Sequence, residues 1–231
     1  MTQQDDAARF AVLIECLCRL QESKERVYGV DWKRFGLVSS MFNMFRKFIR
    51  LRTMWEGGWQ PPDDDSRLDT LIDLHNYVVL CITLHAEMAP AAFTQFLATL
   101  PHARALSPTD FPSDHRGFQR FLKDVLLPDQ SLATPTPALR DAITKLLPLG
   151  QDTIETWLSW MAQLAQAEDN GHDPRASASA SSPSVPLADP HARLAHLYQM
   201  IRLCVAAILR QSYDAPEEWD AFVARYGRAH G

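Results

Sequence analysis

The stretch RLDTLIDLHNYVVLCITLHAEM, at residues 67–88, decides the fold of this chain. Its apolar content and length are typical of a helix that is buried in a bundle. Asp69, Asp73 and Asn76 interrupt the apolar pattern at positions i, i+4 and i+7, so one helical face carries all three. Because burying an unpaired carboxylate is costly, this face needs a cation, a metal ion or water beside it.

The rest of the sequence predicts helices as well. Long segments repeat apolar residues at intervals of three and four, and no segment alternates convincingly between apolar and polar residues as a strand does. We therefore expect an all-α fold, a helical bundle in which Gly29 and Gly36 interrupt the chain between the first two helices. The predicted helices span 6–27, 37–55, 67–87, 91–100, 115–127, 138–147, 152–167 and 191–211, with a short last one within 216–227.

Four regions follow from this pattern. Residues 1–90 are expected to form a core of antiparallel helices, to which residues 91–167 add further helices. Residues 168–190 have almost no apolar content and repeat Ala-Ser, which is typical of a flexible linker or a long surface loop. Residues 191–231 carry helices that are amphipathic enough to dock on the bundle or on a partner.

Composition and charge narrow the range of functions. The net charge of −5 over 231 residues argues against a protein that binds nucleic acid through bulk electrostatics. The first ten residues do not resemble a secretory signal, and the apolar runs are shorter than the roughly 20 residues that cross a bilayer. The four cysteines lack metal or redox spacing and are expected to be reduced and buried. The sequence thus predicts a cytoplasmic protein without a membrane partner.

A basic stripe lies on the helix that precedes the acidic face. Arg46, Lys47 and Arg50 share one side of the predicted helix 37–55, and one short loop joins this helix to the one that carries the two aspartates. An antiparallel pair is the simplest packing, so the two charged faces can meet. They then either pair as interhelical salt bridges, or the carboxylates hold Mg²⁺ while the basic side chains hold the phosphates of a nucleotide.

Residues 24–84 also resemble a known family in the order and spacing of several short motifs. The matching elements are Lys24, YGVDWKRFG at 28–36, Lys47 with Arg50, and DTLIDLHNY at 69–77. Together they resemble the all-α nucleotide pyrophosphohydrolase superfamily of MazG type, and most closely its phage-associated branch that serves nucleotide modification.

The resemblance implies a helical bundle that binds a nucleoside triphosphate and, in hydrolytic members, cleaves it with Mg²⁺ and water between the α and β phosphates. It makes Asp69 and Asp73 catalytic metal ligands, and Glu22 and Glu25 could complete the metal site if the first helix packs beside the third. The residues expected to contact the nucleotide are Lys24, Trp32, Arg46, Lys47, Arg50, Asn76 and Tyr77. A homo-oligomer is also expected, since bundles of this kind often complete their sites between protomers.

The chain departs from the family pattern in its acidic residues. MazG-type hydrolases carry the cluster E-E-x-x-E on one helix, whereas residues 37–54 of this chain contain no acid. A second function therefore stays open, that of a non-catalytic helical interaction or nucleotide-binding protein that has lost the full metal site.

Overall fold

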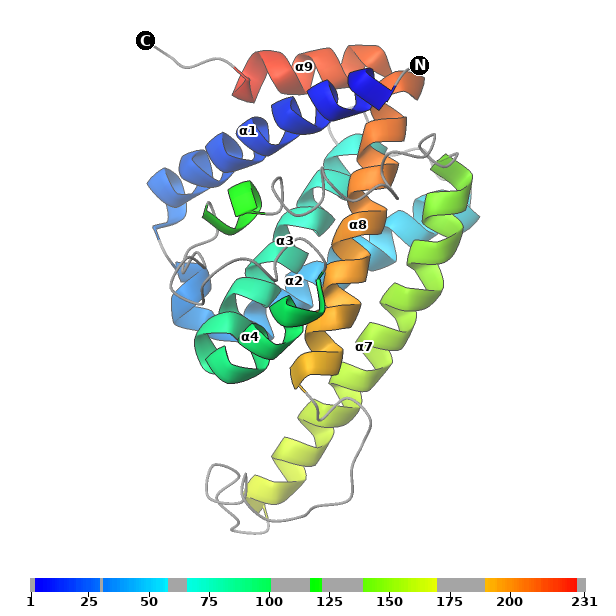
Figure 1. Cartoon of the computed structure of the whole chain (residues 1–231). Helices are drawn as coiled ribbons and strands as arrows, with labels where there is room; N and C mark the ends of the chain where they lie inside the picture. Colours follow the sequence, from blue (N-terminus) through cyan, green and yellow to red (C-terminus); the bar gives the residue numbers. More distant parts are fainter. Residues whose placement is uncertain are drawn as a thin grey trace.

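The computed structural model describes residues 3–29, 31–57, 66–100, 117–121, 139–169 and 190–227. These residues form helices and no strand, so the predicted all-α fold is confirmed (Figure 1). The helices are α1 (Gln3–Tyr28), α2 (Asp31–Glu56), α3 (Arg67–Met88), α4 (Pro90–Thr99), α7 (Leu139–Asp169), α8 (Pro190–Asp214) and α9 (Pro216–Tyr226). A short helical segment at 117–121 lies between α1 and α3 (Figure 1).

Helix α3 lies at the centre of the bundle. It packs against α2 and α8, and its apolar side chains, such as Leu71 and Val78, are fully buried. The Thr70 hydroxyl lies 3.7 Å from the sulfur of Met54, and Lys47 contacts Asp73, so α2 and α3 run antiparallel as expected. A helix that is apolar on nearly all sides is stable only when neighbours cover it, which explains why the other helices gather around α3.

Helix α8 is the second core helix. By length and composition alone it could cross a membrane, but 67% of its most apolar stretch is buried inside the bundle. Helix α7 packs along it, and α4 covers its first turns through Phe96, whose ring lies 5.7 Å from that of Tyr198. The apolar character of α8 therefore serves the core.

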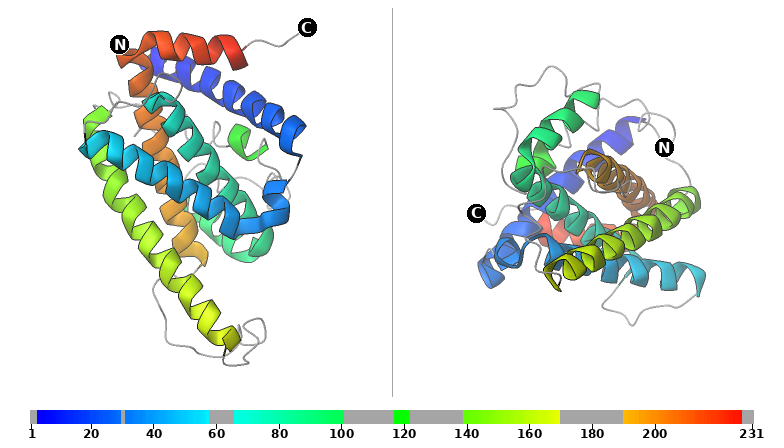
Figure 2. Two further views of the ribbon diagram at one scale, coloured as in Figure 1. Left: turned by 180° about the vertical axis from the view of Figure 1, so that it is seen from behind. Right: turned by 90° about the horizontal axis from the view of Figure 1, so that it is seen from below.

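Helices α1 and α9 cross one end of the bundle side by side (Figures 1 and 2). The guanidinium of Arg9 donates to the carbonyl and the hydroxyl of Ser212 at 2.9 Å each, and Arg19 donates to the carbonyl of Tyr226 at 3.3 Å. The hydroxyl of Tyr213 lies 3.0 Å from a carboxylate oxygen of Asp6. These contacts join the two ends of the described chain, which lie more than 200 positions apart in sequence.

Local signals lie at the ends of the first three helices, but α2 begins at Asp31, before Gly36, and not at residue 37 as predicted. Gly29 has φ 64° and donates its N–H to the carbonyl of Glu25 at 2.8 Å, which is a left-handed helix end that favours glycine. Gly36, with φ 68°, separates the first turn of α2 from the rest of the helix. Ser66 caps α3, because its side chain accepts from the N–H of Asp69.

The predicted break between helices 138–147 and 152–167 is wrong. A single helix, α7, continues through Pro148, and Gly150 faces the buried ring of Phe48 on α2. A Cβ atom at Gly150 would fall inside the space of that ring. Glycine at this position thus permits a close approach of two helices and does not end one.

Gly150→Ala is expected to lower the free energy of unfolding by about 1–3 kcal/mol, because the new methyl group overlaps Phe48. Urea denaturation measures this loss. The matched control is the double variant with Phe48→Leu, which should lose less than the sum of the two single variants. A Gly150→Ala protein that is more stable than the original chain, as helix propensity alone would make it, would contradict the close approach.

Candidate functional site

Asp73 on α3 lies between two lysines. Its Oδ1 accepts from the Lys24 ammonium of α1 at 2.9 Å, and its Oδ2 lies 2.6 Å from the Lys47 ammonium of α2. The side chain of Asp73 is 23% exposed. Of the two sequence interpretations of the charged faces, the salt-bridge pairing is confirmed for Lys47 and Asp73.

The electrostatics of this cluster follow from partial burial and from opposite charges at contact distance. Burial alone would raise the pKa of Asp73, but the charge of Lys24 and the hydrogen bonds from both lysines outweigh it, so the pKa lies below its usual value. Burial would lower the pKa of Lys24, and the Asp73 carboxylate instead holds it above its usual value. Asp73 and Lys24 are therefore both charged at neutral pH, and Lys47 contacts the second carboxylate oxygen.

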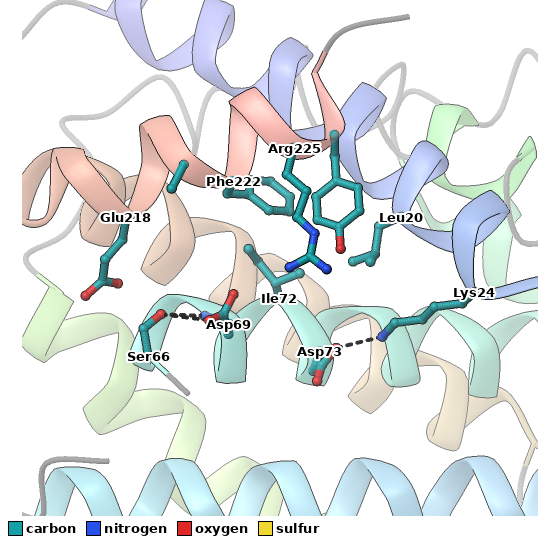
Figure 3. Close-up of a pocket in the computed structure, with 11 residues that line it drawn as sticks. Leu20, Lys24, Ser66, Asp69, Ile72, Asp73, Glu218, Phe222 and Arg225 are labelled. Atoms are coloured by element: carbon teal, nitrogen blue, oxygen red, sulfur yellow. Dashed lines mark hydrogen bonds and ion pairs between the residues drawn. The ribbon is translucent and has the colours of Figure 1, made fainter. Parts of the chain in front are cut away.

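A pocket of about 460 Å³ opens beside this cluster, between α1, α3 and α9 (Figure 3). Its size falls in the range of small-molecule sites. The residues that line it are Leu20, Lys24, Ser66, Asp69, Ile72, Asp73, Glu218, Ala221, Phe222, Arg225 and Tyr226. Lys24, Asp69 and Asp73 were predicted as site residues, so the structure brings three of them to one pocket.

Asp69 lies at the start of α3 and takes part in a capping arrangement. Its N–H donates to the Ser66 hydroxyl oxygen at 3.1 Å, and the Ser66 hydroxyl donates to a carboxylate oxygen of Asp69 at 3.2 Å. An acid in the first turn also lies favourably with respect to the helix dipole. Asp69 thus stabilises the helix that carries Asp73, and its side chain is exposed to the pocket.

Asn76 and Tyr77, which were predicted to contact the nucleotide, are not among the residues that line the pocket. Asn76 is buried and accepts from the side-chain nitrogen of Gln119 at 2.9 Å, and Tyr77 packs against the core. Next to Asn76, burial lowers the pKa of His75 to about 4, against a smaller opposing effect of Asn76. Polar groups on this part of α3 therefore belong to the bundle interior.

Four further charged side chains that were predicted as site residues, on α1 and α2, also do not line the pocket. Arg46 is exposed on α2 and Arg50 is half-buried on the same helix, and neither lines the pocket. On α1, Glu25 accepts from the side chain of Gln21 at 3.0 Å, and Glu22 is half-buried outside the pocket lining. The side chain of Trp32 lies outside the described part of the structure.

The described carboxylates do not fit a Mg²⁺ site. Mg²⁺ takes an octahedral set of oxygen ligands, often one or two carboxylates with phosphate oxygens and water. Both oxygens of Asp73 already contact ammonium groups, and one oxygen of Asp69 accepts from Ser66. Within the described ranges, no three His, Cys, Asp or Glu side chains lie close enough to hold a metal ion. Mg²⁺ stays a prediction of the resemblance, and no chemical step is derived through it.

Sequence reasoning missed the contribution of α9. Glu218, Phe222, Arg225 and Tyr226 line the pocket from a helix that was predicted only to dock on the bundle or on a partner. The Arg225 guanidinium lies 5.4 Å from the centre of the Tyr226 ring and points into the pocket (Figure 3). The spacing of Phe222, Arg225 and Tyr226 at i, i+3 and i+4 places them on one face, but this signal does not identify which helix that face meets.

Comparisons with known proteins found no family model, no curated protein and no solved structure that is significantly similar to this chain. The MazG-like resemblance therefore stays a prediction, and the site must be interpreted from its own geometry.

Asp73→Asn is expected to lower the free energy of unfolding by about 1–3 kcal/mol at pH 7, because two lysines lose their shared carboxylate. The pKa of Asp73 is lowered in the folded state, so its stabilising contribution is present above the unfolded pKa of about 3.9 and is lost as the pH falls below it. The difference between the two proteins should accordingly shrink between pH 5 and pH 2–3, about the range in which such a carboxylate titrates.

Urea denaturation at both ends of this pH range measures the effect. The control is Asp220→Asn on α9, an exposed acid outside the pocket, for which a change within about 0.5 kcal/mol is expected. Equal stability of the Asp73→Asn variant and the original chain at pH 7 would show that the ion cluster contributes nothing to folding.

Proposed function

We propose that this chain is a non-catalytic binding protein for a nucleotide or a closely related phosphorylated ligand, and that the ligand occupies the pocket between α1, α3 and α9. The observation that carries the proposal is the pair of cations, Lys24 and Arg225, beside an apolar surface in a pocket of about 460 Å³. Phosphate recognition needs such cations, and a base or another ring needs the apolar surface.

Lys24 and Arg225 are the groups available to a phosphate. The Lys24 ammonium has three donors and uses one for Asp73 at 2.9 Å, so further donors can reach a ligand. Arg225 is exposed, and among the residues that the structure describes no carboxylate pairs with it. Because Lys47 also neutralises Asp73, that carboxylate does not cancel the positive charge at this end of the pocket.

The contacts of Asp69 and Asp73 favour a binding function over hydrolysis. A metal-dependent pyrophosphohydrolase needs carboxylates that are free to hold Mg²⁺, whereas Asp73 pairs with lysines and Asp69 caps α3. The second candidate function is the Mg²⁺-dependent nucleoside triphosphate pyrophosphohydrolase that the resemblance implies. What favours it is that both aspartates line the pocket that also holds Lys24 and Arg225.

Thermal melting of the full chain against nucleoside mono-, di- and triphosphates, each with and without Mg²⁺, separates the two candidates. A ligand at 100 times its dissociation constant should add about 2.7 kcal/mol of stability. A shift that needs no Mg²⁺ and yields no product supports the binding protein. A Mg²⁺-dependent shift with release of pyrophosphate supports the enzyme, and no shift with any nucleotide removes both.

Arg225→Gln is expected to weaken binding of a nucleoside triphosphate by about 10- to 100-fold, the effect of losing one charge-assisted hydrogen bond. The loss should be much smaller for the matching nucleoside, which lacks the phosphates. Arg225 is exposed, so the variant should melt at the temperature of the original chain. Isothermal titration calorimetry provides the affinities.

Arg46→Gln is the matched control. Arg46 is also an exposed arginine, but it lies on α2 and does not line the pocket. An affinity that falls for Arg46→Gln and not for Arg225→Gln would move the phosphate site to the basic stripe of α2 and contradict the proposed pocket.

A further inference from the structure

The pocket has two ends of opposite charge (Figure 3). Asp69 and Glu218, with the Ser66 hydroxyl, lie at one end, and Lys24 lies at the other beside Asp73, whose charge it shares with Lys47. The Arg225 guanidinium lies between the two ends. A simple anion would need only the basic end. The pocket therefore suits a ligand that carries hydrogen-bond donors at one end and negative charge at the other.

Apolar side chains separate the two ends. Leu20, Ile72 and Phe222 line this part of the pocket and are largely buried, with Leu20 and Phe222 more exposed, at 7% and 6%, than Ile72 at 2%. A flat ring can lie against such a surface while its edge reaches polar groups beyond it. In a nucleotide, the base would then lie against Phe222, and the phosphates would reach Lys24 and Arg225.

The capping of α3 fixes which way the ligand lies. An open helix N-terminus would attract phosphate, but Ser66 and Asp69 already exchange two hydrogen bonds there at 3.1 and 3.2 Å. The Asp69 carboxylate also repels a phosphate at this end. Phosphates are thus directed to Lys24 and Arg225, and the opposite edge of the ligand meets Asp69 and Glu218.

We propose that the pocket selects guanine nucleotides and that Glu218 is the residue that recognises the base, an inference that rests on the proposed nucleotide binding. Guanine presents two adjacent donors, N1–H and the N2 amino group, and one carboxylate can accept from both. Adenine presents an acceptor at N1, and uracil flanks its single N–H with carbonyl oxygens, so both place lone pairs against the carboxylates. Site groups that lose their hydrogen-bond partner penalise such analogues strongly.

Glu218 suits this role better than Asp69 because, among the residues that the structure describes, none forms a hydrogen bond or ion pair with its carboxylate. It lies in the first turn of α9 beside Glu217, and both acids are exposed. Glu218 lines the pocket and Glu217 does not. The two residues therefore form a matched pair, equal in charge and nearly equal in position on the helix, that differ in access to the ligand.

The test measures binding of GTP, ITP, ATP and UTP to the full chain by calorimetry at one ionic strength without Mg²⁺. ITP is guanosine triphosphate without the N2 amino group, so it removes one donor and keeps the ring and phosphates. We expect GTP to bind about tenfold more tightly than ITP, and more tightly still than ATP and UTP. Glu218→Gln should weaken GTP binding about tenfold and strengthen UTP binding, because the neutral amide no longer repels the uracil carbonyl oxygens, whereas Glu217→Gln should change neither.

The outcomes separate this inference from the proposed function. Equal affinities for the four nucleotides would overturn guanine selection and leave nucleotide binding in place. Equal losses for Glu217→Gln and Glu218→Gln would overturn base recognition by Glu218, since the effect would then come from the charge of the first turn of α9. No binding of any of the four nucleotides would overturn both proposals. Inorganic triphosphate then tests whether the pocket binds phosphate alone.

Discussion

Asp73 carries a charge on a helix that its neighbours cover on several sides, and this one carboxylate constrains the helices around it. It cannot be left without partners, because an unpaired charge in a half-buried position destabilises the fold. Its two oxygens contact Lys24 of α1 and Lys47 of α2 at 2.9 and 2.6 Å. The cluster therefore ties the crossing helix α1 and the antiparallel helix α2 to the centre of the bundle at a single point.

The same constraint shapes the surface next to it. The pocket opens where Lys24 reaches from α1 to α3, and α9 closes it from the other side through Phe222 and Arg225. Helix α9 is held there by contacts between the first and last helices, among them Arg19 with the carbonyl of Tyr226 at 3.3 Å. The pocket thus depends on packing between opposite ends of the chain.

Those parts of the fold that depend on short stretches of sequence could be predicted. The apolar pattern of residues 67–87 differs from the observed limits of α3 by one residue at its end, and Gly29 and Gly36 mark turns that need positive φ. The break predicted between 147 and 152 shows where such reasoning fails, because α7 continues through Pro148 and its Gly150 lies against Phe48 of another helix. Two of the pocket's three helices were expected to contribute, but α9 could not be assigned, since amphipathic spacing does not specify which partner a face meets.

The presence of two lysines on one carboxylate bears directly on how the pocket can bind a ligand. If Lys24 were the only partner of Asp73, a phosphate that drew its ammonium away would leave a carboxylate unpaired in a half-buried position. Lys47 is less exposed than Lys24, at 25% against 37%, does not line the pocket and contacts the other oxygen of Asp73. Lys24 can therefore turn toward a ligand while Lys47 keeps the carboxylate paired, so that one lysine maintains the fold and the other is available for binding.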